Sequence, residues 1–466
     1  MMGDAQKDLR AAWDDLIHEL QRARDAIDQP ELMPAPPSDR NLAEGYRYLA
    51  GFLHGAIERA FHGDPRFPSF RNALSIRTKA TIDNSDAIYF MAPIDGRDPY
   101  IVRGQVADHR HWRGEAPAKS GRLAPQYLIF ELNDGCLAGD SGSLAELRPG
   151  VKVQMGRLDS SELQVAADGS FEILLAPERP AGHTGNYICS HKRVSRPHPD
   201  DPNAPLDRYA CWISGRQLFY DWEREDPTPL SITRVGQEYD HPPAYTPERA
   251  AAQLREMGAL TRGQMHFWNE FYTVLLETYG KRDGGHPGRP GERFMPRNAF
   301  NQPNAASGAT GGGQSTNIYA GGVFELEPDE ALIIESRIPE PPQYIGFHLA
   351  NLWGESLDYA NHQTSLNGFQ VEPDPDGVLR YVVAHRDPGV PNWLDTTGQR
   401  EGFLTPRWAY SQQPPPDRWP TIRATVVRFD EIRKHLPAGT RTVTAQERAE
   451  KIRVRQEHVQ RRYRVF

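Results

Sequence analysis

The sequence predicts a mainly β fold of the α+β class: two tandem β-sandwich or jelly-roll domains with N-terminal, central and C-terminal helices. Three observations support this prediction. The 466 residues include 40 Gly and 40 Pro, which indicates many turns and therefore many short strands. Helical periodicity appears before, between and after two long regions of strand-like pattern. The order of motifs in the first of these regions recurs in the second.

Residues 1–70 are predicted to form the N-terminal helices. In each of two segments, apolar residues recur every three or four positions, as on one face of a helix. We expect both faces to pack on a domain. The first set is Leu9, Trp13, Leu16, Leu20, Ala23 and Ile27, and the second is Leu42, Tyr46, Leu49, Leu53, Ile57 and Ala60.

Residues 71–240 are predicted to form the first β-sandwich domain. Short apolar runs at 87–92 and 127–132 are typical of buried strands. Asp168-Gly169 marks a turn, and in the following strand Phe171, Ile173 and Leu175 share one face. This alternation indicates an antiparallel sheet with one apolar face.

Residues 241–280 are predicted to be connecting helices, with Thr246 as a cap and Pro247 at the first helical position. The Gly-, Pro- and Asn-rich stretch 281–317 is either a linker or a lid over a binding site. If it is a lid, its candidate contacts are Arg297, Asn298 and Asn301. Residues 437–466 contain a capping box at 444–447 and should form the C-terminal helix.

The second β-sandwich domain is predicted at 318–436, as an internal duplication of the first. Order is kept between the two copies while the loops differ in length. The matching positions are 127–132 with 344–349, Asp168-Gly169 with Asp376-Gly377, Asn186 with Asn392, and Arg216 with Arg407. Asn and Arg at matching positions of both copies favour a role in the fold over a role in one active site.

Composition excludes several classes of protein. The formal net charge is −8, so there is no electrostatic basis for binding a nucleic acid. No apolar run of about 18 residues is present, so no membrane span is expected. The N-terminus lacks the pattern of a signal peptide. Three widely spaced cysteines form neither a disulfide framework nor a zinc pattern, which favours a reducing, cytoplasmic location.

Four segments of the second copy carry a family resemblance. They are 361–367 (NHQTSLN), Asp376-Gly377, 387–395 (DPGVPNWLD) and Arg407-Trp408. Together they resemble the bacterial domain-of-unknown-function 1214 family. The first copy resembles a degenerate form, with Tyr187 where the second has Trp393. The resemblance implies a β-sandwich or jelly roll without an established reaction, and a small, largely apolar ligand of lipid, steroid or aromatic catabolism.

The densest polar cluster lies between positions 348 and 363. Its candidate catalytic residues are Glu355, Asp358 and His362, because these groups can exchange protons. His348 lies opposite the apolar side of its strand, where it either binds a ligand or meets solvent. The spacing fits no metal motif, so no metal site is predicted, and the cofactor is unknown. The candidate ligand-binding residues are His348, Asn351, Trp353, Tyr359, Gln363, Asn367, Asn392, Trp393, Asp395, Arg407 and Trp408.

These observations predict a cytoplasmic enzyme of small-molecule catabolism that acts on a largely apolar metabolite. One alternative is a non-catalytic protein that binds a lipid or saccharide through Trp353, Tyr359, Trp393 and Trp408. Another is an assembly component whose terminal helices form the contacts of a homo-oligomer. The expected partners are a small molecule and further copies of the chain.

Overall fold

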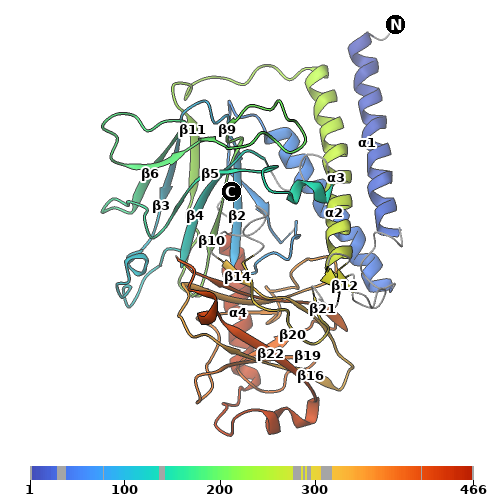
Figure 1. Ribbon diagram of the computed structural model, residues 1–466, viewed down its shortest axis with the longest axis vertical. Helices are drawn as coiled ribbons and strands as arrows, with labels where there is room; N and C mark the ends of the chain where they lie inside the picture. Colours follow the sequence, from blue (N-terminus) through green and yellow to red (C-terminus); the bar gives the residue numbers. More distant parts are fainter. Residues whose placement is uncertain are drawn as a thin grey trace.

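A computed structural model describes residues 3–28, 38–76, 78–135, 142–276, 285–286, 289–290, 295–305, 317–410 and 412–463. The predicted fold class is confirmed, since the chain is mainly β with flanking helices (Figure 1). Two β-sandwiches are stacked along the long axis, and three of the long helices lie beside the first. Most of the predicted loop 281–317 lies outside the described residues.

The first sandwich contains a five-stranded and a four-stranded sheet. The five-stranded sheet has the order β1 (Arg71–Leu74), β2 (Ala87–Pro93), β10 (Trp212–Leu218), β4 (Tyr127–Asn133), β5 (Gln154–Asp159). The other has the order β11 (Leu230–Arg234), β3 (Tyr100–Gln105), β6 (Ser170–Ala176), β7 (Asn186–Cys189). Alternate residues such as Phe130, Phe171 and Ile213 fill the core between the sheets. A separate ribbon pairs β8 (His191–Arg193) with β9 (Asp207–Tyr209).

The second sandwich repeats this plan. One sheet contains β14 (Asn317–Tyr319), β15 (Gly322–Glu325), β21 (Glu401–Ala409), β17 (Tyr344–Ala350) and β18 (Ser365–Asn367). The other has the order β20 (Trp393–Asp395), β19 (Leu379–Ala384), β16 (Glu330–Arg337), β22 (Thr421–Arg428). Its core includes Phe347, Tyr381 and Leu404. The strands β12 (Gly285–His286) and β13 (Arg289–Pro290) form a separate pair.

The two sandwiches have the same strand order. The series β2-β10-β4-β5 corresponds to β15-β21-β17-β18, and β11-β3-β6-β7 corresponds to β22-β16-β19-β20. In both copies the last two strands of the four-stranded sheet are parallel. Parallel neighbours need a crossover, so this shared exception to antiparallel pairing is a specific sign of duplication.

Asn186 and Asn392 hold this crossover in the same way. The Asn186 amide donates to the carbonyls of Gln164 (2.8 Å) and Glu172 (2.9 Å), and its Oδ1 accepts from Gln164 N. The Asn392 amide donates to the carbonyls of Glu372 (2.6 Å) and Arg380 (2.9 Å), and its Oδ1 accepts from Glu372 N. Each asparagine side chain therefore satisfies backbone N–H and C=O groups that have no partner strand at the crossover.

Three helices form a layer beside the first sandwich. They are α1 (Asp4–Asp28), α2 (Asp39–His62) and α3 (Pro247–Leu275). The three meet where Leu16, Ala60 and Met257 pack together. Thr246 caps α3 and Pro247 opens it, as predicted. The expected pair of connecting helices is wrong, because this segment is one continuous helix.

The packing face of α2 differs from the predicted one. Leu42, Tyr46 and Ile57 are exposed, whereas Gly45, Tyr48 and Phe52 pack inward or lie close to Trp353. A Cβ at position 45 would lie 2.7 Å from Trp353 Cζ2, so glycine allows the large ring to approach the helix. Trp13 on α1 is exposed as well. The apolar periodicity of α2 therefore identifies the helix but not its buried side.

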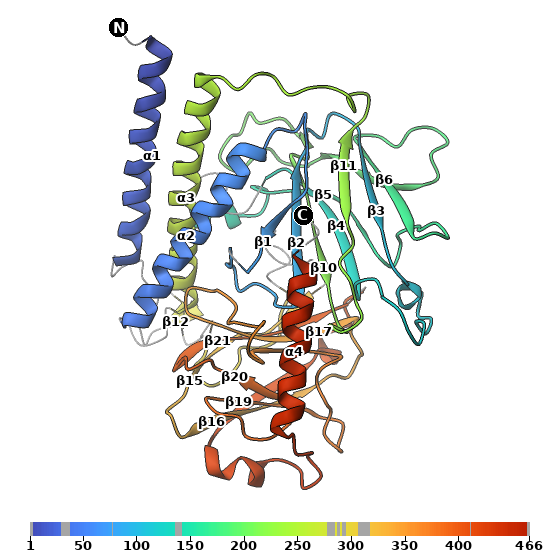
Figure 2. The same ribbon diagram turned by 180° about the vertical axis from the view of Figure 1, so that it is seen from behind.

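The two sandwiches meet end to end. Ala87, Tyr127 and Leu218 of the first five-stranded sheet pack against Tyr344 and Ala409 of the second. The C-terminal helix α4 (Ala445–Arg462) runs across both sandwiches (Figure 2) and begins with the predicted capping box. Short 3-10 helices lie at η1 (Arg110–Arg113), η2 (Leu144–Leu147), η4 (Pro416–Arg418) and η5 (Phe429–His435). No helix in the described residues is long and apolar enough to cross a membrane.

Candidate functional site

His348 on β17 points away from the core of its own sandwich, as predicted. It does not meet solvent, because the first sandwich covers this face and buries the ring completely. Its Nε2 lies 3.3 Å from the hydroxyl of Tyr344. Burial and the charges of Arg407 and Arg455 lower the pKa of His348 well below its ordinary value. The imidazole is therefore neutral near pH 7.

Asp86 is the centre of the buried joint between the sandwiches. Its Oδ2 accepts a hydrogen bond from the Tyr344 hydroxyl (2.6 Å), and its Oδ1 accepts from Asn367 Nδ2 and Trp222 Nε1, both at 3.1 Å. Burial raises the pKa of Asp86, against the opposing effect of Tyr344 and the nearby charge of Arg462. Asn367, a predicted ligand-binding residue, thus joins the two sandwiches.

Other predicted binding residues support the fold around this joint. Gln363 donates to the carbonyl of Trp393 (2.6 Å) and accepts from Arg448 Nη1 (2.8 Å). Asn351 donates to Glu355 (2.8 Å). The rings of Trp353, Tyr359, Trp393 and Trp408 are all buried. They therefore offer no exposed aromatic surface to a lipid or saccharide.

His362 and Asp395 are in hydrogen-bond contact at the surface of the second sandwich. His362 Nδ1 lies 2.8 Å from Asp395 Oδ2, and the His362 side chain is 45% exposed. A carboxylate can only accept, so Nδ1 carries the proton and Nε2 is left as the basic nitrogen. Thr397 N donates to Asp395 Oδ1 (2.8 Å), and Arg40 donates to the carbonyl of Thr397 (3.1 Å). These bonds hold Thr397 at a φ of 52°, a strained value for a β-branched residue.

Asp358 lies close enough to His362 for their charges to interact. Its carboxylate accepts from the backbone of Ala360 and Asn361 and from the Asn361 side chain. Partial burial raises the pKa of Asp358, but the hydrogen bonds from Asn361 and the charges of Lys79 and His362 outweigh this and lower it. Asp358 is therefore ionised near pH 7.

Glu355 is buried, and the charge of Lys79 acts on both Glu355 and Asp358. Arg47 of α2 binds it through Nη2 (2.6 Å) and Nε (3.3 Å), in the two-pronged geometry typical of guanidinium and carboxylate. Burial raises the pKa of Glu355, although Arg47 and Asn351 oppose this. The Arg47 side chain is 60% exposed, so it covers Glu355 from the solvent side.

Sequence reasoning missed Lys79, whose ammonium group joins the same cluster. Lys79 Nζ donates to the carbonyls of Ser356 (2.8 Å) and Leu357 (3.1 Å) and lies 4.7 Å from the ring centre of Tyr359. Burial lowers the pKa of Lys79, while Asp83 and Glu355 oppose the change. Nothing in the local sequence marks Lys79 or Arg47, because each is separated from Glu355 by more than 270 positions.

The structure thus places two of the predicted catalytic residues, Asp358 and His362, close to each other and His362 in contact with Asp395. The third, Glu355, is linked to Asp358 through Arg47 and Lys79, whose charges interact with both carboxylates. We call these six residues the His362 cluster. The predicted lid residues contact other elements. Asn298 bonds to the backbone of Glu325, Arg297 pairs with Glu325 (2.8 Å), and Asn301 accepts from Gly321 N. They fix residues 295–305 to β15.

The cluster contains groups that can transfer protons. Across the ranges that the structure describes, no three His, Cys, Asp or Glu side chains converge as metal ligands would. His362 can accept a proton at Nε2, while Asp395 holds the ring and stabilises its protonated form. The carboxylates and cations of the cluster can orient polar groups of a ligand.

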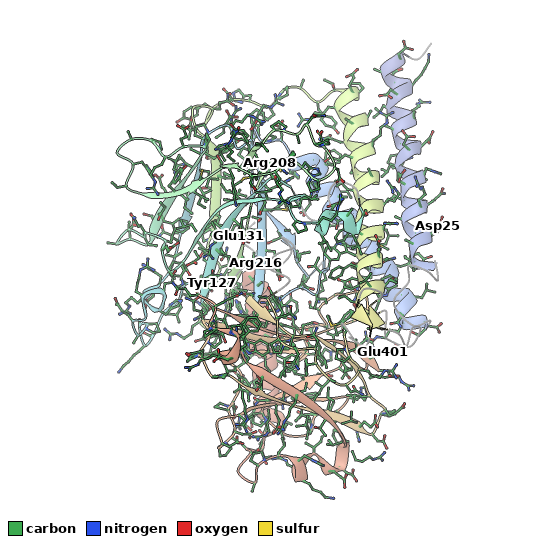
Figure 3. All side chains as sticks on the ribbon, in the orientation of Figure 1. Asp25, Tyr127, Glu131, Arg208, Arg216 and Glu401 are labelled. Atoms are coloured by element: carbon green, nitrogen blue, oxygen red, sulfur yellow. The ribbon has the colours of Figure 1, made fainter. Side chains whose placement is uncertain are left out.

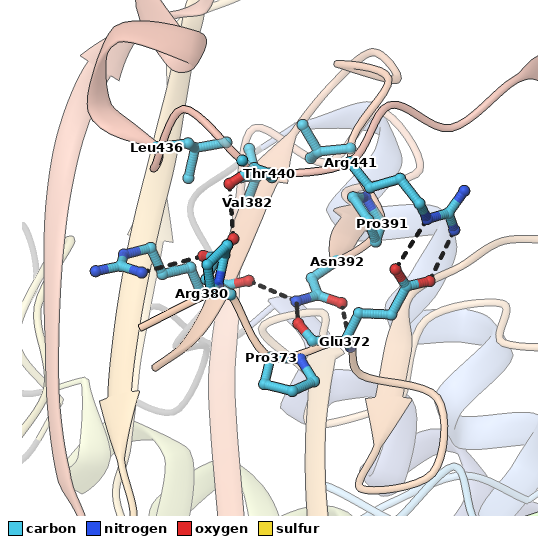
Figure 4. Close-up of a pocket in the computed structure, with 13 residues that line it drawn as sticks. Glu372, Pro373, Arg380, Val382, Pro391, Asn392, Leu436, Thr440 and Arg441 are labelled. Atoms are coloured by element: carbon cyan, nitrogen blue, oxygen red, sulfur yellow. Dashed lines mark hydrogen bonds and ion pairs between the residues drawn. The ribbon is translucent and has the colours of Figure 1, made fainter. Parts of the chain in front are cut away.

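A separate hollow of about 190 Å³ lies beside Asn392 (Figure 4). Its charged residues are paired with one another. Arg441 binds Glu372 (2.8 Å) and Arg380 binds Asp374 (3.1 Å). The Asn392 amide donates its hydrogen bonds to the backbone carbonyls of Glu372 and Arg380. These bonds give Asn392 a structural role, whereas the sequence predicted a ligand contact.

The chain resembles solved structures over most of its length. A crystal structure of an uncharacterized protein from Burkholderia cenocepacia has a TM-score of 0.71 and 26% sequence identity, covering 91% of this chain and 99% of that one. The VPA0106 protein from Vibrio parahaemolyticus matches with a TM-score of 0.39 and 12% identity, covering 87% of this chain and 100% of its own. No protein-family model and no curated protein matches the sequence. The Burkholderia protein and this chain share one fold, and the resemblance to the domain-of-unknown-function 1214 family stays a prediction.

Proposed function

We propose that the protein is a cytoplasmic enzyme of small-molecule catabolism that uses His362 as a general base, positioned by Asp395. The proposal is supported chiefly by the 2.8 Å contact between His362 Nδ1 and Asp395 Oδ2 on a half-exposed imidazole. The contact leaves Nε2 as the basic nitrogen, and the exposure gives a ligand access to the ring.

The neighbouring charges have separate roles in this proposal. Asp358 stabilises the imidazolium that forms when Nε2 accepts a proton, because the two side chains interact electrostatically. Arg47 binds Glu355 through Nε and Nη2, and its side chain is 60% exposed, so its Nη1 can bind a polar group of the substrate. The substrate class, a small and largely apolar lipid, steroid or aromatic metabolite, comes from the family resemblance.

The test is to incubate the purified protein with a small-molecule extract of the cells that produce it and to follow metabolites by mass spectrometry. We expect the wild type to consume at least one metabolite. His362→Gln should reduce that rate by about 10²-fold or more, and Asp395→Asn by a smaller factor, because general-base catalysis contributes about 10²–10⁴-fold.

His191→Gln is a matched control. His191 Nε2 lies 2.9 Å from Asp207 Oδ1 in a comparable surface pair of the first sandwich, away from the His362 cluster. This variant should retain the wild-type rate. A wild type that consumes nothing, or a His362→Gln variant as fast as wild type, would contradict the proposal.

A homo-oligomer is a second proposal, supported by an exposed apolar surface on α1 and α2. Trp13, Ile17, Ile57 and Phe61 are exposed and flank the point where Leu16 and Ala60 pack together. Large exposed apolar surfaces commonly mark subunit contacts. Trp13→Gln combined with Ile57→Gln should lower the mass measured by light scattering to that of one chain. Tyr239→Gln, at another exposed aromatic residue, should leave the mass unchanged.

A further inference from the structure

The outward faces of the two five-stranded sheets differ at one pair of equivalent positions. Across β4 and β10, Ile129 faces Arg216, and across β17 and β21, Gly346 faces Arg407. Two residues further along the same strands, Glu131 in the first copy corresponds to His348 in the second. The duplication has therefore kept the arginine and replaced the neighbouring carboxylate with an imidazole.

The arginine of the first copy has its charge neutralised. Arg216 Nη1 lies 3.0 Å from Glu131 Oε2, and the two side chains lie on neighbouring strands (Figure 3). Gln154 donates to the other oxygen of Glu131 (2.9 Å). The guanidinium of Arg216 also lies 5.5 Å from the ring centre of Tyr89. The charge of Arg216 is therefore balanced by a carboxylate of its own sandwich.

The arginine of the second copy has no such partner. Arg407 is only 9% exposed, yet among the described residues it forms no ion pair, although the charge of Asp83 lies close enough to interact with it. Its Nη2 donates to the carbonyl of Ile82 (2.9 Å), whereas its Nε is buried without a hydrogen-bond partner. A buried guanidinium that lacks a counter-charge is costly, so native structures almost always pair it.

The surroundings of Arg407 are partly open to solvent. Tyr319, whose ring centre is 5.9 Å from the Arg407 guanidinium, is partly exposed, as are Tyr89 and Arg216. The charges of Arg407 and Arg216 both act on Tyr89, so the two arginines approach the same ring from the two sandwiches. Asp83 and Lys79 lie nearby, but their opposite charges offset each other.

We propose that Arg407, together with Arg216, Tyr89 and Tyr319, binds a small oxyanion at the junction of the two sandwiches. With Glu131 counted as the partner of Arg216, the group carries one net positive charge, which suits a single carboxylate or a phosphate monoester. The fork of Arg407 supplies directed donors, and the tyrosine rings supply flat apolar walls for the rest of the ligand. None of these four residues belongs to the His362 cluster, although Lys79 of that cluster lies nearby, and the proposal does not depend on the activity of the cluster.

The test uses sodium benzoate and sodium phosphate as probes, with sodium chloride at matched ionic strength. Binding is measured by titration calorimetry and by the shift in melting temperature. We expect one of the two probes to bind and to raise the melting temperature, since a ligand that binds only the folded state stabilises it. Benzoate binding alone would assign a carboxylate ligand, and phosphate binding alone a phosphorylated one.

Two variants test the role of Arg407 itself. Arg407→Lys keeps the charge but loses the forked donors and should weaken binding at least tenfold. His348→Glu restores the carboxylate of the first copy, and it should abolish binding because Arg407 is then neutralised. Arg103→Gln, at an exposed arginine of β3, is the control for nonspecific salt effects and should bind like wild type.

The proposal fails if neither probe binds the wild type or raises its melting temperature more than sodium chloride does. That result would mean that water alone hydrogen-bonds to Arg407. The proposal also fails if the folded Arg407→Lys and His348→Glu variants both bind as tightly as wild type. Circular dichroism verifies that each variant is folded.

Discussion

The two sandwiches are most alike where strands cross and least alike where the sandwiches face each other. Asn186 and Asn392 make the same three hydrogen bonds at equivalent points. On the facing sheets, by contrast, the pair Glu131 and Arg216 corresponds to His348 and Arg407. Asn186 and Asn392, which are kept with the same contacts, serve the architecture that both copies share. Arg216 and Arg407 are also kept, but their contacts differ, since Arg216 pairs with Glu131 and Arg407 lies in the copy in which His348 replaces that carboxylate.

The largest expected difference concerns a cross-strand ion pair that occurs in both copies with its charges reversed. Arg103 faces Glu172 across β3 and β6, and Glu335 faces Arg380 across β16 and β19. The first pair is at least half exposed, whereas Arg380 is 9% exposed and also binds Asp374 and Asp376. Arg380→Ala should lower the free energy of unfolding by about 3 kcal/mol, since it leaves the buried carboxylate of Asp374 without a counter-charge.

Arg103→Ala should cost less than about 1 kcal/mol, because exposed ion pairs contribute little. Urea unfolding of both variants measures the two values. Equal losses would show that burial does not make the Arg380 pair contribute more to stability than the Arg103 pair, which would contradict this prediction.

The second prediction concerns the crossover asparagines, which make the same hydrogen bonds in both copies. Asn186→Ala and Asn392→Ala each remove three hydrogen bonds and leave backbone groups without partners. Each variant should therefore lose about 2 kcal/mol of unfolding free energy. Thermal and urea unfolding should give similar values for the two. A loss confined to one copy would mean that the shared geometry is not equally important in both.

The limits of sequence-based prediction follow from the same contrast. Strand alternation, turn dipeptides and the capping signals at Thr246 and Thr444 are local, so the fold class and the helix starts could be predicted. The match of Asn186 with Asn392 could be found because equal spacing is visible along the chain. In each case the residues that determine the feature lie close to it or repeat it.

Only part of the His362 cluster could be predicted from the sequence. Glu355, Asp358 and His362 are neighbours in sequence, but Arg47 and Lys79 reach them through tertiary packing. The pattern of β17 correctly gave the direction of His348, yet nothing local indicates that another domain covers that face. The packing side of α2 was missed for a similar reason, since Trp353 of the second sandwich occupies the space beside Gly45.

The smallest expected effect is a pH dependence that belongs to the second copy. Burial lowers the pKa of His348 well below that of the unfolded chain, which is about 6.5 for histidine. Below pH 6.5 the unfolded chain binds a proton that the folded chain does not, so the stability from this group is present above pH 6.5 and is lost as the pH falls. The slope is about 1.4 kcal/mol per pH unit for one histidine.

His348→Gln removes this contribution, whereas Glu131→Gln at the equivalent position of the first copy does not. Asp86 has a raised pKa and contributes a slope of the opposite sign, so wild-type stability alone is not the readout. The readout is the difference in unfolding free energy between variant and wild type, measured from pH 7.5 to 5.5. Relative to the wild type, the unfolding free energy of His348→Gln should be about 1 kcal/mol higher at pH 5.5 than at pH 7.5. The reason is that the wild type must release a histidine proton when it folds at low pH, whereas the variant has no such proton to release. A difference independent of pH would mean that His348 takes up its proton in the folded state, and that Arg407 then lies beside a second positive charge.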